Sequence, residues 1–200
     1  MRSRTRQLIV PIDPDRPLRW AVLECLYCLA RETRLALRPR PWRVFLSHTS
    51  DLRSIPRERS FVAAAEAAVI RTGHAVVDMA YFSAQEAPSA EYCKRMVAKS
   101  DIYVGIIGVH YGSPVRGRPN LSYTELEYET ATSLGLARLV FLISDDAPSM
   151  SSVVQPSEHR AQQDAFRARL READLMTVGI RSPADLELSL MRALYERSSQ

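Results

Sequence analysis

The chain has 200 residues, of which 46% are hydrophobic and 25% charged, enough to bury a core in one compact domain that carries an appendage. Its net charge of +4 arises in residues 1–43, which contain ten arginines and four acidic residues. Because basic and aromatic residues do not interleave on one element, we expect no nucleic acid as partner. The three cysteines are an odd number and do not indicate a secreted disulfide framework, so we expect a cytoplasmic protein. Since no apolar run is long enough to cross a bilayer, we expect no membrane as partner.

Residues 1–41 precede the regular pattern of the chain and are predicted to form a basic N-terminal extension with one helix. The stretch RWAVLECLYCLARETRLAL within it has apolar residues at helical spacing. Cys25 and Cys28 have the spacing of a redox pair, but the same spacing places two small side chains on one helical face. Because no strand precedes them, packing in a core is the favoured interpretation.

From residue 42 onwards, short apolar runs alternate with longer helical patterns. The predicted strands are residues 42–47, 74–79, 101–108, 137–144 and 175–180. The predicted helices are residues 57–73, 89–100, 122–135, 156–174 and 182–197. Strands that alternate with helices of this length imply a parallel sheet covered on both faces. We therefore predict an α/β domain over residues 42–197, with a flavodoxin-like, doubly wound sheet of five parallel strands in the order 2-1-3-4-5.

Such a sheet binds ligands at the carboxyl ends of its strands, at the point where the strand order reverses. In the predicted order this point lies between the first and third strands. The segments that leave these strands are SHTSD, residues 47–51, and GVHYGSPVRGRPNLS, residues 108–122. Both are rich in hydroxyl side chains, and the second leads directly into the predicted helix at residues 122–135.

That helix begins with SYTELEYETA, which contains Glu125, Glu127 and Glu129. At about 100° per residue, Glu125 and Glu129 lie about 40° apart, whereas Glu127 lies about 200° from Glu125. We expect the outer two glutamates to be solvated and Glu127 to face the sheet. A carboxylate in that position either binds a ligand or, as a structural alternative, caps the helix or braces a loop.

Several motifs resemble a known family. VFLSHTSDL, residues 44–52, resembles the first strand and loop of Toll/interleukin-1 receptor (TIR) domains. Together with YFSAQEAPSAEYCKRMVAKSDIYVGIIGVHYGSP and SYTELEYETA, it is similar to the TIR-like DUF4062-type domain of unknown function found at the N-terminus of many STAND-type NTPases. The resemblance covers residues 43–196 and implies the same fold.

The resemblance also implies a catalytic role for Glu127. In NAD-cleaving TIR enzymes, a glutamate on the helix after the third strand is catalytic and follows an aromatic residue by four positions, as Glu127 follows Tyr123. Nucleoside deoxyribosyltransferases, which have a related fold, carry a Thr-x-x-Glu-x-x-x-Ala pattern that is matched by Thr124, Glu127 and Ala131.

The implied function is that of a signalling or effector domain of a bacterial defence or STAND-type system, which cleaves the nicotinamide–ribose bond of NAD. NAD is then a substrate, and no separate cofactor is expected. The expected substrate-binding residues are Ser47, His48, Thr49, Tyr111, Ser122 and Tyr123. NAD-cleaving TIR domains usually have small residues, a tryptophan and a cysteine before the glutamate, where this chain has NLSYTELE. A second interpretation therefore stays open, namely a non-catalytic module that self-associates or binds a STAND-type NTPase.

Other chemistries lack their motifs. There is no G-x-G-x-x-G and no P-loop, so we expect no ATP hydrolysis by this chain. A receiver domain requires an aspartate at the end of the third strand and a lysine after the fifth, where the chain has IIGVH and GIRS. His48 and His110 can approach each other across the crevice, but without a cluster of further ligands we expect no metal site. Cys93 lies in a helical pattern and is expected to be buried.

Overall fold

The computed structural model describes residues 40–79, 90–148, 159–173 and 177–199. The predicted N-terminal helix, with Cys25 and Cys28, lies outside the described residues. The division of the chain at residues 41 and 42 therefore stays a prediction.

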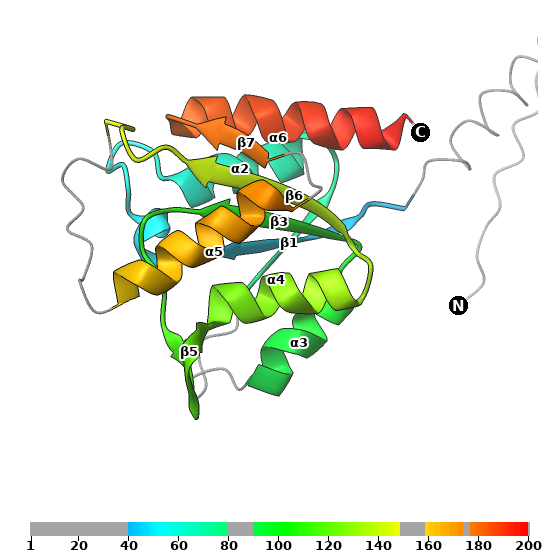
Figure 1. Ribbon diagram of the computed structural model, residues 1–200. Helices are drawn as coiled ribbons and strands as arrows, with labels where there is room; N and C mark the ends of the chain where they lie inside the picture. The colour runs from blue at the N-terminus through cyan, green and yellow to red at the C-terminus, as the bar shows by residue number, and fades with distance from the viewer. Residues whose placement is uncertain (1–39, 80–89, 149–158, 174–176, 200) are drawn as a thin grey trace, which may run out of the picture. The chain divides into compact units, whose positions relative to one another are not determined.

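Five parallel strands form one sheet in the order β2-β1-β3-β6-β7 (Figure 1). They are β1 (Arg43–His48), β2 (Ala75–Asp78), β3 (Ile102–Ile107), β6 (Ala137–Ile143) and β7 (Thr177–Ile180). Since β6 and β7 are the fourth and fifth strands of this sheet, the predicted α/β fold and the order 2-1-3-4-5 are confirmed. The strand order reverses between β1 and β3, which are direct neighbours in register, with Ser47 beside Gly105.

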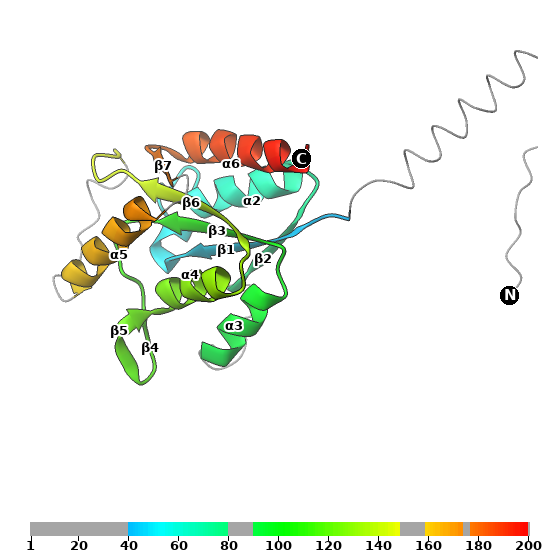
Figure 2. The same ribbon diagram turned by 45° about the vertical axis from the view of Figure 1, so that its right-hand side comes forward.

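Helices cover both faces of the sheet, as the prediction required (Figures 1 and 2). One face carries α2 (Phe61–Arg71) and α6 (Pro183–Ser198), and the other carries α3 (Ala90–Ala98), α4 (Tyr123–Ser133) and α5 (Arg160–Glu172). Strand β1 supplies both layers, because its side chains alternate: Val44 and Leu46 pack with α2 and α6, and Phe45 packs with α3 and α4. Burying each such side chain stabilises the fold by about 1.5–3 kcal/mol.

Serine side chains set the start of three helices. The hydroxyls of Ser60, Ser122 and Ser182 accept the backbone N–H of the residue three positions later. Helix α2 therefore begins at Phe61 and not at residue 57, where the alanine-rich pattern had placed it.

The segment between β3 and α4 contains a hairpin that was not predicted. Strands β4 (Pro114–Val115) and β5 (Arg118–Ser122) pair antiparallel, and Gly117, with φ of +78°, forms the turn between them. After β1, residues Ser50–Arg53 form the short helix η1. Among the helices of the described ranges, none combines the length and the apolar character needed to span a membrane.

Candidate functional site

A pocket of about 780 Å³ opens where the strand order reverses, beyond the ends of β1 and β3. It is bounded by the loops that follow these two strands, by the first turns of α4, and by single residues from α3 and from the ends of β2 and α5. The lining residues are His48, Thr49, Ser50, Asp51, Ser54, Met79, Cys93, His110, Tyr111, Gly112, Ser113, Tyr123, Thr124, Glu127 and His159. The pocket therefore lies at the expected position in the sheet.

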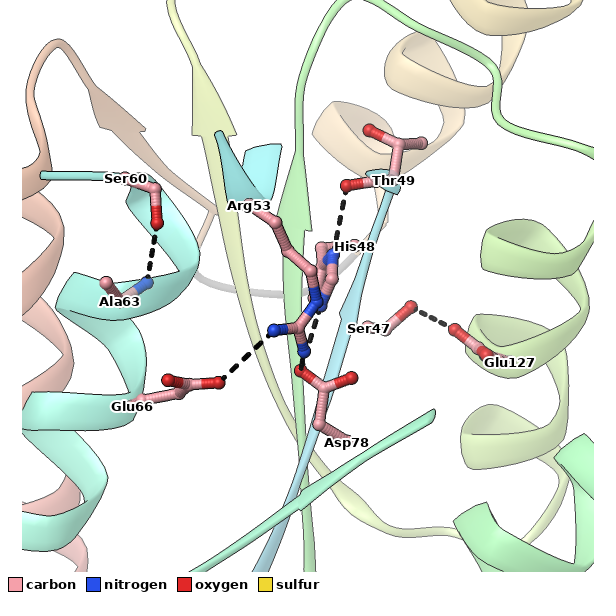
Figure 3. A network of polar contacts seen from close by, with 9 residues as sticks. All are labelled: Ser47, His48, Thr49, Arg53, Ser60, Ala63, Glu66, Asp78 and Glu127. Carbon is pink, nitrogen blue, oxygen red and sulfur yellow. Dashed lines mark hydrogen bonds and ion pairs between the residues drawn. The ribbon is translucent and has the colours of Figure 1, made fainter. Parts of the chain in front are cut away.

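Glu127 lines this pocket from the second turn of α4. Its side chain is buried, with 6% of the residue exposed, and its Oε2 accepts a hydrogen bond of 2.6 Å from Ser47 Oγ (Figure 3). Burial raises the pKa of Glu127 to about 7, although the hydrogen bond from Ser47 and the charge of His48 both favour the ionised form. The charge of Asp78 acts in the same direction as burial. Near neutral pH, the carboxyl group is therefore divided between its two protonation states.

The register of β1 explains why Ser47 meets Glu127. Ser47 shares a strand face with Phe45, which packs with Ala131 one turn after Glu127 on α4. This apolar contact holds the helix against the strand and places the two polar groups side by side. Cys93 of α3 is buried beside them, as expected, and burial together with the charge of Glu127 raises the pKa of its thiol to about 12. The Cys93 thiol thus stays protonated and is no nucleophile at neutral pH.

His48 points to the other side of β1, toward Asp78 at the end of β2 (Figure 3). Its Nε2 lies 2.9 Å from Asp78 Oδ2 and its Nδ1 lies 3.0 Å from the carbonyl oxygen of Thr49. Burial opposes the charge on the ring, but the hydrogen bond and the charge of Asp78 outweigh it, and the pKa of His48 is raised. His48 lines the pocket as expected, yet both ring nitrogens are engaged by the protein.

Thr49 has a buried hydroxyl group without a partner among the described residues. The residue is 7% exposed and lines the pocket, and its Oγ1 makes no hydrogen bond within the described part of the chain. Gly112 lies against it with φ of +83°, and a Cβ atom there would lie 3.1 Å from Thr49 Cγ2 and 3.4 Å from Thr124 Oγ1. Gly112 thus packs closely against Thr49 in the wall of the pocket.

The expectation that Glu125 is solvated is wrong. Glu125 is 8% exposed, and its Oε2 accepts a hydrogen bond of 2.6 Å from Tyr111 Oη while its Oε1 pairs with Arg169 of α5. Helix α4 is covered on this side as well, because Tyr111 and α5 pack there. Glu129 is exposed, as expected, and lies 3.9 Å from Arg169.

The remaining candidate residues differ in their positions. Tyr111 and Tyr123 line the pocket, and Tyr111 is tied to the hairpin because its Oη also accepts the backbone N–H of Ser122. Ser122 is fully buried and caps α4, so it does not reach the pocket. Ser47 contacts Glu127 and is not among the lining residues. The structure thus brings five of the seven candidates to one cavity and places Ser47 directly behind it.

Asp78 is a site residue that sequence reasoning did not identify. It is 1% exposed and binds Arg53 of η1 in addition to His48. The available signal was a charged residue at the carboxyl end of the predicted strand at residues 74–79, which does not adjoin the predicted reversal of strand order. His110 Nδ1 lies 3.1 Å from Asp51 Oδ2. Within the described ranges, no group of three or more histidine, cysteine or acidic side chains is arranged to hold a metal ion.

Comparisons with known proteins relate the chain to one family. A family model described as a domain of unknown function (DUF4062) matches residues 43–195. Among solved structures, the chain is similar to the TIR domains of the activated Roq1 resistosome that directly recognizes the pathogen effector XopQ. The sequence identity is 17% and the TM-score is 0.40, and the match covers 79% of this chain and 84% of that one. It is also similar to the metal-soaked Flv1 flavodiiron core from Synechocystis sp. PCC6803, with 14% identity, coverage of 88% and 41%, and a TM-score of 0.42. No curated protein matches the chain significantly.

Proposed function

Because the chain belongs to the DUF4062 family, whose description names no function, we propose from the geometry of the pocket that this domain cleaves the nicotinamide–ribose bond of NAD or a related nucleotide. The observation that carries the proposal is the buried carboxyl group of Glu127, which lines a pocket of about 780 Å³ and accepts a hydrogen bond from Ser47. The volume lies within the range of small-molecule sites in proteins, roughly 300–1,000 Å³.

The proposed reaction breaks the bond between C1′ of the ribose and the nicotinamide nitrogen. The bonding electron pair leaves with nicotinamide, which becomes neutral, so the leaving group needs no proton. The ribosyl group develops the positive charge of an oxocarbenium ion, which the ionised Glu127 carboxylate stabilises. Water then adds to C1′ and releases a proton, giving ADP-ribose and nicotinamide.

The raised pKa of Glu127, about 7, suits this task. A group with a pKa near the working pH can accept the proton of the attacking water. The positive charge of the bound nicotinamide ring would favour the carboxylate and lower its pKa in the complex. Substrate binding would thus generate the form of Glu127 that the chemistry needs.

Other lining residues offer contacts suited to a nucleotide. The rings of Tyr111 and Tyr123 can present faces to a base, and Thr49, whose hydroxyl group has no partner within the described residues, lies in the same wall of the pocket. Ser47 acts by orienting Glu127. The motifs SYTELEYETA and VFLSHTSDL support a biological role as the signalling or effector domain of a bacterial defence or STAND-type system, with an NTPase as partner.

The direct test is to incubate the concentrated protein with NAD and to measure nicotinamide by chromatography. We expect wild type to release nicotinamide and Glu127→Gln to be slower by a factor on the order of 100 or more, since the charge is lost at nearly unchanged volume. Glu129→Gln, on the exposed side of α4, is the matched control and should retain the wild-type rate. Equal rates in wild type and Glu127→Gln would refute the proposal.

A second candidate function is self-association without catalysis. The observation in its favour is an exposed apolar pair on α6, where Leu188 is 72% exposed and Tyr195 is 52% exposed. Seven positions separate them, so both lie on one face of the helix. Sedimentation at increasing concentration, with Leu188→Asp as the comparison, tests it: assembly that this substitution abolishes, without any nicotinamide release, would support the module.

A further inference from the structure

We propose that His48 is a doubly protonated imidazolium at neutral pH, fixed by Asp78 and the Thr49 carbonyl, and that it acts as a positioning residue whose charge favours the ionised form of Glu127. The charge on His48 follows from hydrogen-bond geometry alone. Its importance for catalysis rests on the proposed function.

The two partners of the ring determine its protonation state. Nδ1 lies 3.0 Å from the carbonyl oxygen of Thr49, which can only accept a hydrogen bond. Nε2 lies 2.9 Å from Asp78 Oδ2, and this same oxygen already accepts a hydrogen bond from the guanidinium group of Arg53. Neither partner donates, so each ring nitrogen must carry its own hydrogen. A ring with two N–H groups is an imidazolium.

The balance of buried charge supports this state. The described acidic side chains near the end of β1 include Asp78 from β2, Glu127 from α4, and Glu66 from α2, which lies 3.7 Å from Arg53. Arg53 of η1 is the cation that contacts both Asp78 and Glu66. A charged His48 places a further cation beside Asp78, which is 1% exposed. A neutral ring would remove the positive charge of His48 from beside the nearly inaccessible Asp78, at a substantial cost in desolvation.

The position of His48 also excludes a role as general acid or base. Both nitrogens are engaged by the protein, so neither can exchange a proton with a substrate while these bonds hold. The remaining effect is electrostatic. Asp78 disfavours a negative charge on Glu127, and His48 opposes that influence from the neighbouring position on β1. His48 and Asp78 therefore act as a pair whose combined charge near Glu127 is close to zero.

Nuclear magnetic resonance tests the charge state without any assay of activity. In protein labelled with ¹⁵N at histidine, with His48 assigned by comparison with His48→Gln, we expect both ring nitrogens to be protonated at pH 7. His74 is an internal control, because burial lowers its pKa and its ring should be neutral at the same pH. A neutral His48 ring at pH 7 would overturn the proposal. Asp78→Asn should lower the midpoint of the His48 titration by about one pH unit or more.

The effect on Glu127 is tested by following its ¹³C-labelled carboxyl group during a pH titration, with assignment through Glu127→Gln. We expect the midpoint to move upward by about one pH unit in His48→Gln, because a cation that offsets the charge of Asp78 near Glu127 is then lost. An unchanged midpoint would show that the charge of His48 does not favour the ionised form of Glu127. Both titrations give their answer even if the protein releases no nicotinamide, an outcome that would refute only the proposed function.

Discussion

Ser47 Oγ and Glu127 Oε2 lie 2.6 Å apart, although 80 positions separate these residues in the chain. The contact joins the carboxyl end of β1 to the second turn of α4. It places a buried carboxyl group beside a cavity, with the Ser47 hydroxyl as its hydrogen-bond donor within the described part of the chain.

Ser47→Ala should make Glu127 harder to ionise. The hydrogen bond from Ser47 favours the carboxylate, and a hydrogen bond to a charged group contributes about 1.5–3 kcal/mol, which corresponds to about 1–2 pH units. We expect the titration midpoint of Glu127 to rise by that amount in a carboxyl ¹³C experiment. Ser133→Ala, at the exposed end of α4, is the control and should leave the midpoint unchanged.

Glu127→Gln should stabilise the protein at alkaline pH. The pKa of Glu127 is raised from 4.5 to about 7, so the folded state binds the proton more tightly and stability falls as the pH rises through this window. At pH 8, the neutral amide avoids this penalty, which is on the order of 3 kcal/mol. Urea unfolding at pH 8 and pH 5.5 should show a larger gain at pH 8. A variant that is less stable than wild type at pH 8 would contradict the placement of Glu127.

Gly112→Ala should damage the pocket more than it damages the fold. Both Gly112, with φ of +83°, and Gly117, with φ of +78°, have backbone conformations that cost about 1–2 kcal/mol for alanine. Only at Gly112 would the new Cβ atom press against Thr49, at 3.1 Å, whereas a Cβ atom at Gly117 meets nothing within 4 Å. We expect similar losses in unfolding free energy for the two variants, but a loss of nicotinamide release for Gly112→Ala only. Equal activities would show that the Gly112–Thr49 contact does not shape the site.

The sheet was predictable because buried parallel strands read as continuous apolar runs and the helices between them have a different period. The strand runs around Phe45 and Phe141 are examples. The hairpin formed by β4 and β5 escaped prediction because Pro114–Val115 and Arg118–Ser122 are short and largely exposed, so they carry no pattern of burial.

Site positions that depend on the period of one helix were predictable. Contacts between segments that lie far apart in the sequence were not. The helical period placed Glu127 inward. The same reasoning failed for Glu125, because its partners Tyr111 and Arg169 come from segments 14 and 44 positions away. The pairing of His48 with Asp78 arises from the register of β1 and β2, which a single sequence does not reveal.

The most direct test of the central claim is the pH dependence of nicotinamide release from NAD in single-turnover experiments between pH 5 and pH 9. Since Glu127 must lose its proton to stabilise the ribosyl cation, kcat/KM should rise with pH and level off above its pKa of about 7. The rise should be absent in Glu127→Gln. A rate in the wild type that is flat or that falls across this range would contradict the assignment of the buried, ionised Glu127 as the catalytic residue.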